Sequence, residues 1–232
     1  WIAFIDADDA WSKDRLEKLL LLEPRVTGEY MLVDNIMRCI ETDGGLVPWK
    51  SIKRKFRDGK NNKGLQLSDY LEEHSYLIKP IIPRASIISN SLEHSDLTYG
   101  ADAQFFIRLQ KCASLKIKHL DEALYFYRMS PGAMSAAEGT SLKMKKMLQG
   151  LLKEFDFSEA EKSAIERKIR ILDRQVILEP FNENLKNGKL IRALSYGVLH
   201  PICFLLFLWR LPSSLTYRLA VIIAGGKARS LY

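Results

Sequence analysis

Short apolar runs alternate with longer segments of helical period along the first part of the chain. These runs, of which residues 36–40 alternate loosely, predict strands at residues 2–5, 30–33, 36–40, 116–120 and 123–127, and the first is expected to be a buried strand. The turn sequence Asp43-Gly44-Gly45 follows the third of these runs and predicts a β-hairpin. Strands that alternate with helical segments predict an α/β fold.

Apolar residues spaced three or four positions apart predict helices at residues 14–22, 65–77, 102–113 and 142–155. Ser158 and Glu161 form a capping-box sequence, which predicts the start of one more helix. Residues 50–64 are polar and basic, as in a surface loop, and the two prolines in residues 79–89 predict a bend into a short strand. These changes of pattern divide the chain into an α/β part at residues 1–138, a helical extension at 139–183 and a tail at 184–232.

The net charge of +7 is concentrated in the tail. Seven cations and no anion follow Glu183, so the rest of the chain is neutral and offers no general attraction for nucleic acid. The tail holds two apolar runs, residues 202–209 and 219–225, each far shorter than the roughly 20 residues that span a bilayer. Basic residues around short apolar segments are typical of helices that lie in an anionic membrane surface. The alternative is an amphipathic cap that closes the core.

Three widely spaced cysteines, Cys39, Cys112 and Cys203, indicate reduced thiols in a cytosolic setting. Together with the tail they predict a cytoplasmic protein, peripheral on the inner face of the cell membrane. The chain does not begin with Met, and Trp1 leads directly into a strand. We therefore expect an N-terminal portion with partner strands to precede it.

Three carboxylates, Asp6, Asp8 and Asp9, follow the first predicted strand. In open α/β sheets ligands bind beyond the carboxyl ends of strands, and clustered acids repel one another unless a cation neutralises them. Mg²⁺ and Mn²⁺ prefer carboxylate oxygens and often share them with substrate phosphates. The acids therefore predict a Mg²⁺ or Mn²⁺ site for a phosphate-bearing substrate. Alternatively, they only form a turn and cap the helix at residues 14–22.

Two families place Asp-x-Asp after an apolar strand. In haloacid-dehalogenase-type phosphatases the first Asp is a nucleophile, but the continuation Asp9-Ala10-Trp11 departs from their pattern. Residues 4–16, Phe-Ile-Asp-Ala-Asp-Asp-Ala-Trp-Ser-Lys-Asp-Arg-Leu, closely resemble the corresponding stretch of the family 2 glycosyltransferases, which have the GT-A fold.

The resemblance to these transferases continues over about residues 1–135. They carry an acid, often Glu-Asp, just before a helix beneath the acceptor site; Asp102 matches the acid, while Ala101 stands where Glu is usual. Their strand pair ending in Tyr-Arg, followed by a Ser-containing loop, is similar to Tyr127-Arg128 and residues 129–135. The processive signature Gln-x-x-Arg-Trp is absent from the sequence, which favours a non-processive enzyme of the bacterial exopolysaccharide type.

The resemblance implies a GT-A-like, Rossmann-like mixed sheet flanked by helices, truncated at its N-terminus and followed by a C-terminal helical extension. It implies an inverting, non-processive glycosyltransferase that moves a sugar from a nucleotide-sugar donor to a saccharide or lipid-linked acceptor in surface polysaccharide synthesis. The family binds the nucleotide mainly on βα units before the acidic strand. The resemblance therefore leaves open whether this polypeptide is active alone.

The resemblance also implies roles for single residues. Asp8, with Asp6 and Asp9, would hold the metal ion, and Arg128 would join Asp6 and Asp8 in facing the donor. Asp102 would be the general base for the acceptor hydroxyl, kept ionised by the dipole of its helix.

Structural and functional alternatives stay open for these residues. Trp11 is expected either to stack on the acceptor sugar or to be an ordinary core aromatic. Asp102 is alternatively an N-cap only, and Arg128 a structural residue at a strand end. The functional alternatives are a phosphatase with Asp6 as nucleophile and Asp8 as acid, and an inactive interaction module attached to a membrane.

Overall fold

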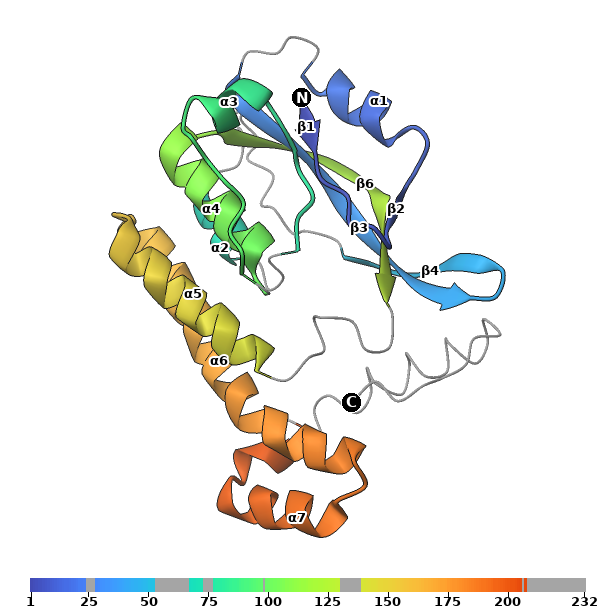
Figure 1. The fold of residues 1–232 in the computed structure, drawn as a ribbon, viewed down its shortest axis with the longest axis vertical. Helices are drawn as coiled ribbons and strands as arrows, with labels where there is room; N and C mark the ends of the chain where they lie inside the picture. Colours follow the sequence, from blue (N-terminus) through green and yellow to red (C-terminus); the bar gives the residue numbers. More distant parts are fainter. Residues whose placement is uncertain are drawn as a thin grey trace.

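Two long parallel strands, β3 (Tyr30–Thr42) and β6 (Lys116–Met129), form the centre of the sheet (Figure 1). The other strands are β1 (Ile2–Ala3), β2 (Ala10–Trp11), β4 (Gly45–Ile52) and β5 (Ile81–Ile82). The order is β1-β5-β3-β6-β2, with β4 also paired to β3, and every pair except β3–β6 is antiparallel. The computed structural model describes residues 1–23, 28–52, 67–72, 77–97, 99–129, 139–205 and 207, without the side chains of Glu72 and Lys186.

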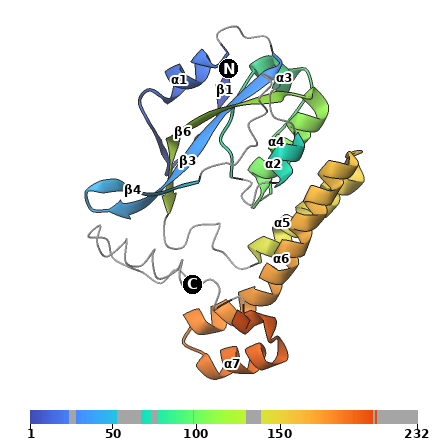
Figure 2. The same cartoon turned by 180° about the vertical axis from the view of Figure 1, so that it is seen from behind.

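Helices flank this curled sheet on both faces (Figures 1 and 2). They are α1 (Arg15–Leu21), α2 (Leu67–Glu72), α3 (Arg84–Ile88) and α4 (Ala101–Ala113). Side chains of β3 alternate between the faces: Met31 and Val33 join α2 and α4 in the main core, whereas Leu32 packs with Leu19 of α1. The predicted α/β class, with a mixed sheet flanked by helices, is confirmed.

The prediction of two separate strands at residues 116–120 and 123–127 is wrong, because β6 is continuous. Asp121 and Glu122 have no paired residue on β3, because Asp34 pairs with Leu120 and Asn35 with Ala123, so the register shifts there. Asn35 of β3 donates a hydrogen bond from Nδ2 to Oδ1 of Asp121 at 2.7 Å across this irregularity. A β-bulge therefore absorbs the polar pair without ending the strand.

The prediction for residues 79–89 is half right. The bend leads into β5, but the strand has only two residues and α3 follows directly. Pro83 precedes α3 with a φ of −59°. Proline cannot donate to a strand ladder, and its fixed φ suits the start of a helix, so it ends one element and begins the next.

Among the described residues, the sheet is followed by helices α5 (Thr140–Glu154), α6 (Glu159–Lys186) and α7 (Leu190–Leu199). The predicted capping box is present at the start of α6, where Ser158 N–H donates to Glu161 Oε2 at 2.8 Å. Leu148 of α5 and Ile165 of α6 belong to the same core as the sheet. The end of α6 and α7 form a second apolar cluster away from the sheet, and α6 runs across the predicted boundary at residue 183 (Figure 1).

Several predictions fall wholly or partly outside the described residues. They concern the basic loop from residue 53, the end of the helix at 65–77, the Ser-containing loop at 130–135, and the tail from residue 208. Within the described ranges, no helix has the length and apolar character needed to cross a membrane.

Candidate functional site

The three acids lie on the segment that joins β1 to β2. Asp9 N–H donates to the carbonyl of Asp6 at 3.1 Å, so the segment makes a tight turn. The Asp8 side chain is exposed to solvent, while Asp6 and Asp9 are partly buried. The acids therefore form the expected turn, but they do not cap α1, whose N-cap is Asp14. Their three side chains lie in different environments.

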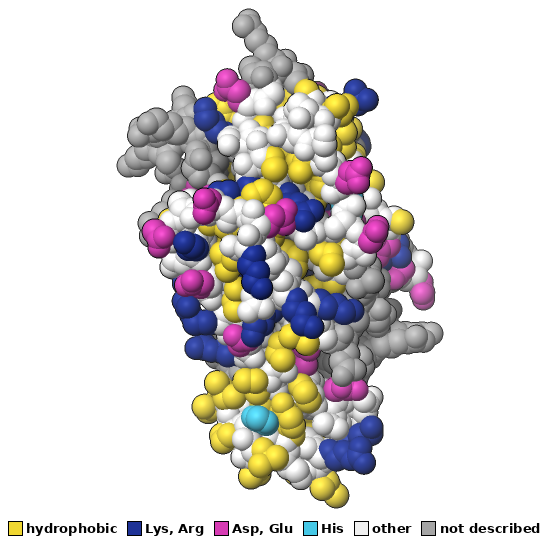
Figure 3. Space-filling view, turned by 60° about the vertical axis from the view of Figure 1, so that its left-hand side comes forward, with side chains coloured by type: hydrophobic (Ala, Val, Ile, Leu, Met, Phe, Trp, Pro, Cys, Tyr) yellow, Lys and Arg dark blue, Asp and Glu magenta, His cyan; other side chains and the backbone are white. Residues whose placement is uncertain are grey.

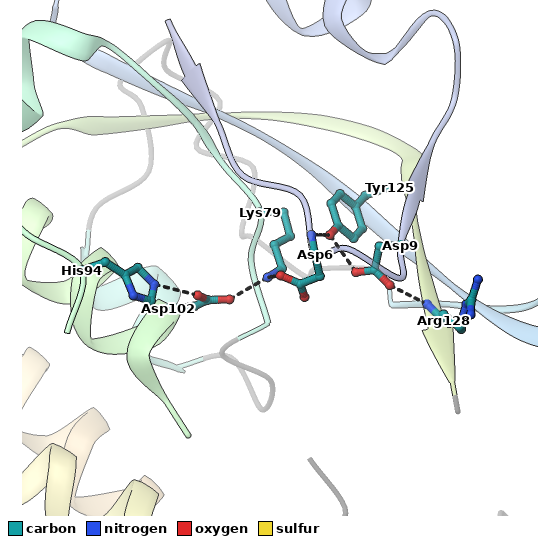
Figure 4. Close-up of polar contacts among 7 residues, drawn as sticks. All are labelled: Asp6, Asp9, Lys79, His94, Asp102, Tyr125 and Arg128. Atoms are coloured by element: carbon teal, nitrogen blue, oxygen red, sulfur yellow. Dashed lines mark hydrogen bonds and ion pairs between the residues drawn. The ribbon is translucent and has the colours of Figure 1, made fainter. Parts of the chain in front are cut away.

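Asp9 attaches the turn to β6 through the buried Tyr125 (Figure 4). The Tyr125 hydroxyl accepts from Asp6 N–H at 3.2 Å and donates to Asp9 Oδ2 at 2.7 Å, and Arg128 N–H donates to Asp9 Oδ1 at 2.8 Å. Burial raises the pKa of Asp9 above its ordinary value, although the bonds from Tyr125 and Arg128 oppose the shift. Both Asp9 oxygens thus serve the fold.

Lys79 joins the acidic turn to α4. It precedes β5, and its side chain is 2% exposed. Its Nζ lies 2.8 Å from Asp6 Oδ1 and 2.6 Å from Asp102 Oδ2 (Figure 4). Burial alone would lower the pKa of Lys79, but the hydrogen bonds and charges of Asp102 and Asp6 outweigh it and raise the pKa. One buried ammonium thus brings together two carboxylates that are far apart in the sequence.

Asp102 has both carboxylate oxygens engaged. Oδ2 accepts from Lys79, and Oδ1 lies 3.1 Å from His94 Nε2. The His94 ring stacks on Phe105 with a centroid distance of 5.8 Å. Burial would raise the pKa of Asp102, but Lys79 and then His94 outweigh it, so the pKa lies below its ordinary value. Asp102 is therefore an ionised, oriented carboxylate.

The N-cap interpretation of Asp102 does not hold. The N-cap of α4 is Gly100, whose φ of 83° is a left-handed conformation that favours glycine. Asp102 lies in the first turn of α4, where the helix dipole favours a negative charge. Its side chain points toward Lys79 and His94 (Figure 4).

A small cleft lies beside the side chains of Lys79, Asp102 and His94. Its walls are mostly apolar, and its polar groups are those of Lys79, His94 and Asp102. It is lined by Phe4, Ile78, Lys79, Pro80, Ile82, His94, Asp102, Phe105 and Phe106. Apolar walls with a few convergent polar groups are the usual features of a small-molecule site.

A buried ion pair positions the backbone of Lys79. Arg15 of α1 is completely buried and donates to Asp34 of β3 from Nε at 3.0 Å and from Nη2 at 2.8 Å. Arg15 Nη2 also donates to the Lys79 carbonyl at 2.6 Å. This pair therefore ties the segment before β5 to β3, the central strand of the sheet.

Trp11 and Arg128 contribute mainly to the framework around the site. The guanidinium carbon of Arg15 lies 4.8 Å from the centre of the Trp11 ring and covers one of its faces, so only the other could stack on a sugar. The Arg128 guanidinium pairs with Glu41 at 3.0 Å and points away from Asp9 (Figure 4), so Arg128 serves the acidic turn through its backbone N–H.

The carboxylates fit a shared metal ion better than a dedicated metal cage. Within the described part of the chain, no group of three or more His, Cys, Asp or Glu side chains is arranged to hold a metal ion. Asp9 has both oxygens occupied by donors, whereas Asp8 is exposed and Asp6 binds Lys79 through Oδ1 alone. Mg²⁺ is often held by one or two carboxylates together with substrate phosphates. Asp8 and Asp6 are suited to that arrangement.

Sequence reasoning missed Lys79 and gave no role to His94 or Tyr125. The signal for Lys79 was present: it is the only charged residue in the apolar and proline-rich run at residues 77–83. A cation in such a run is buried only if it is paired. Tyr125 was expected in the core and lies there, but its hydroxyl reaches the acidic turn.

Replacing Tyr125 with phenylalanine is expected to lower the free energy of unfolding by about 1.5–3 kcal/mol, because a hydrogen bond to a charged group and the acceptor for Asp6 N–H are both lost. The pKa of Asp9 should rise further, since the Tyr125 bond lowers it. Urea unfolding and carboxyl NMR measure the two effects. Tyr127→Phe on the same strand is the matched control, and equal stability of the two variants would contradict this account.

Comparison of the chain with protein-family models, with curated proteins and with solved structures found no match.

Proposed function

We propose that the chain is part of an inverting, non-processive glycosyltransferase with a GT-A fold. It would move a sugar from a nucleotide-sugar donor to a saccharide or lipid-linked acceptor at the cytoplasmic face of the cell membrane. The observation that supports this most is the joining of Asp6 and Asp102 by Lys79, beside a cleft. Donor-side and acceptor-side carboxylates must lie close together for a direct displacement.

In this proposal Asp102 accepts the proton of the acceptor hydroxyl as that oxygen attacks the sugar. Lys79 and His94 hold the carboxylate at a fixed orientation, and its low pKa keeps it ionised. The apolar side chains of Phe4 and Phe105, whose ring centroids are 5.6 Å apart, line the cleft beside Asp102, and the Asp102 side chain is 49% exposed and so open to an acceptor.

Asp8, with Asp6, would hold Mg²⁺ or Mn²⁺ against the donor diphosphate. When bound, such an ion neutralises the negative charge that builds on the leaving group. Asp9 acts on the fold, because it fixes the turn that carries Asp6 and Asp8 onto β6.

Titration calorimetry of the intact natural protein with nucleoside diphosphates tests the proposal. Binding is expected with Mn²⁺ or Mg²⁺ and not with a chelator, and Asp8→Asn should lose most of this affinity. Asp102→Asn should keep the affinity but slow sugar transfer by about 10²–10⁴-fold. Asp43→Asn, at an exposed acid in the β3–β4 turn, is the matched control.

Three outcomes would overturn the proposal. If no nucleoside diphosphate binds in a divalent-dependent way, the transferase assignment fails. Covalent trapping of a phosphoryl mimic on Asp6 would favour a phosphatase. If the Asp8→Asn and Asp102→Asn variants leave the phenotype of the producing cell intact, a non-catalytic interaction module is favoured instead.

A further inference from the structure

The outer surface at the α7 end of the molecule is apolar. It consists of the side chains of α7 and of residues 201–205 that face solvent, here called the α7 face: Leu190, Ile191, Leu194, Val198, Leu199, Ile202 and Leu205. Ile191 is 81% exposed, Leu199 76% and Val198 73%. Figure 3 shows hydrophobic side chains gathered at this end of the molecule. Monomeric soluble proteins rarely expose contiguous apolar surface of this kind without an interaction partner.

The α7 face is held in place by the opposite side of the helix. Ala193 and Cys203 are buried against Phe181 of α6. A Cβ atom at Gly197 would lie 2.6 Å from the Phe204 ring and 3.1 Å from the Phe181 ring, so glycine permits the close contact. The inner side of α7 thus completes a small core, and the apolar outer side is not needed for it.

Polar groups on and beside the α7 face have internal partners. Ser195 Oγ donates to the carbonyl of Ile191 at 2.9 Å. At the end of α7, His200 N–H donates to the Tyr196 carbonyl at 2.9 Å, and Cys203 N–H donates to the His200 carbonyl at 2.8 Å. These groups lose little when water is removed, which suits contact with lipid.

The charged residues of the α7 segment itself, from Lys189 on, are of one sign, whereas Glu183 is exposed near the end of α6. Lys189 and Arg192 are exposed beside it, and no acidic residue follows Glu183 in the sequence. A symmetric contact with a second copy would bring these like charges together. An anionic bilayer offers negative headgroups to the cations and an apolar layer to the side chains.

We propose that the α7 face lies in the surface of an anionic lipid bilayer, with its apolar side chains among the upper acyl chains and Lys189 and Arg192 at the headgroups. This inference is independent of the proposed chemistry. It concerns attachment alone, and α7 would lie along the surface without crossing the bilayer.

Co-sedimentation of the full chain with vesicles tests this inference. Binding is expected to vesicles of phosphatidylcholine and phosphatidylglycerol, much less to phosphatidylcholine alone, and it should weaken as salt is raised. Ile191→Glu combined with Val198→Glu should reduce the binding by at least about tenfold, because two apolar side chains can no longer be buried. Lys189→Gln with Arg192→Gln should reduce binding only to the anionic vesicles.

Leu21→Glu combined with Ile88→Glu, at exposed apolar residues at the ends of α1 and α3, is the matched control and should bind as the wild type does. Wild-type protein that stays in the supernatant, or a double α7 variant that sediments equally well, would overturn the inference. So would a dimer in ultracentrifugation that the α7 variant abolishes, since a second copy would then cover the face. Nucleoside diphosphate binding by the α7 variant separates a failure here from a failure of the proposed function.

Discussion

Replacing Arg15 with methionine is expected to lower the free energy of unfolding by about 3–5 kcal/mol, because removal of one partner leaves the other as an unpaired buried charge. Asp34 would be that charge, since its side chain is only 2% exposed. The Lys79 carbonyl would lose its guanidinium donor as well. The loss should also loosen the acidic turn, because Lys79 holds Asp6.

Urea unfolding of Arg15→Met, Asp34→Leu and the double variant measures this effect. The double variant should recover much of the lost stability, since replacement of a whole buried pair by apolar groups is often neutral. Lys18→Met removes an exposed ion pair on the same helix and should change little. If Arg15→Met were as stable as Lys18→Met, the buried pair would not be essential to the fold.

Replacing Lys79 with methionine is expected to slow the proposed sugar transfer by about 10²-fold or more, because small displacements of positioned groups have effects of this size. Asp6 and Asp102 would repel each other once the ammonium between them is gone. Release of nucleoside diphosphate from a panel of nucleotide sugars by the intact protein measures the rate. Lys118→Met is the control, because Lys118 also pairs with a carboxylate, that of Glu23, but its side chain is 31% exposed and it lies away from the acidic turn.

The Lys79→Met variant also has a readout that needs no substrate. Because its pKa is raised, Lys79 contributes its full stabilisation of the folded state below pH 10.5, the ordinary lysine pKa. This contribution is lost as the pH rises through the pKa of Lys79 in the folded state. Because its pKa is lowered, Asp102 contributes its full stabilisation of the folded state above pH 3.8, the ordinary carboxyl pKa. This contribution is lost as the pH falls through the pKa of Asp102 in the folded state. The stability difference between wild type and variant should therefore be constant between these values and change outside them. A flat difference at all pH values, with an unchanged transfer rate, would contradict a linking role for Lys79.

Local signals in the sequence were sufficient for much of the fold. The Ser158–Glu161 capping box, the turn that joins β3 to β4 and the apolar face of α4 each depend on residues that are close in sequence. The breaks that were placed wrongly depend on neighbours: β6 passes through Asp121 and Glu122 because Asn35 on the adjacent strand accommodates the bulge.

The site was predictable in its carboxylates but not in its cation. Asp6 and Asp102 belong to recognisable sequence patterns, whereas Lys79 belongs to none. A buried Lys79 needs a charged partner. Which carboxylates pair with it depends on the position of the segment before β5, and Arg15 of α1 and Asp34 of β3 fix that position. Such a contact depends on three-dimensional packing and leaves no periodicity in the sequence.

The two interpretations of the tail correspond to two sides of α7, and the membrane interpretation stays a prediction. The cap on the core is the buried side of α7, with Ala193 and Cys203, and the apolar surface of the membrane hypothesis is its exposed side. An amphipathic pattern predicts one buried stripe. α7 has apolar residues on two sides. The pattern does not show that one side packs against the protein while the other stays exposed.

The pairing of α5 with α6 sets a fixed spacing between the cleft and α7. The N-terminus of α4 contacts Met144 of α5, Lys145 pairs with Asp173 of α6, and α6 continues to Lys186. At 1.5 Å per residue this last stretch measures roughly 20 Å. In a protein attached through α7, as proposed above, this stretch would hold Asp102 away from the bilayer, so that the length of a lipid-linked acceptor glycan would decide whether it reaches the carboxylate.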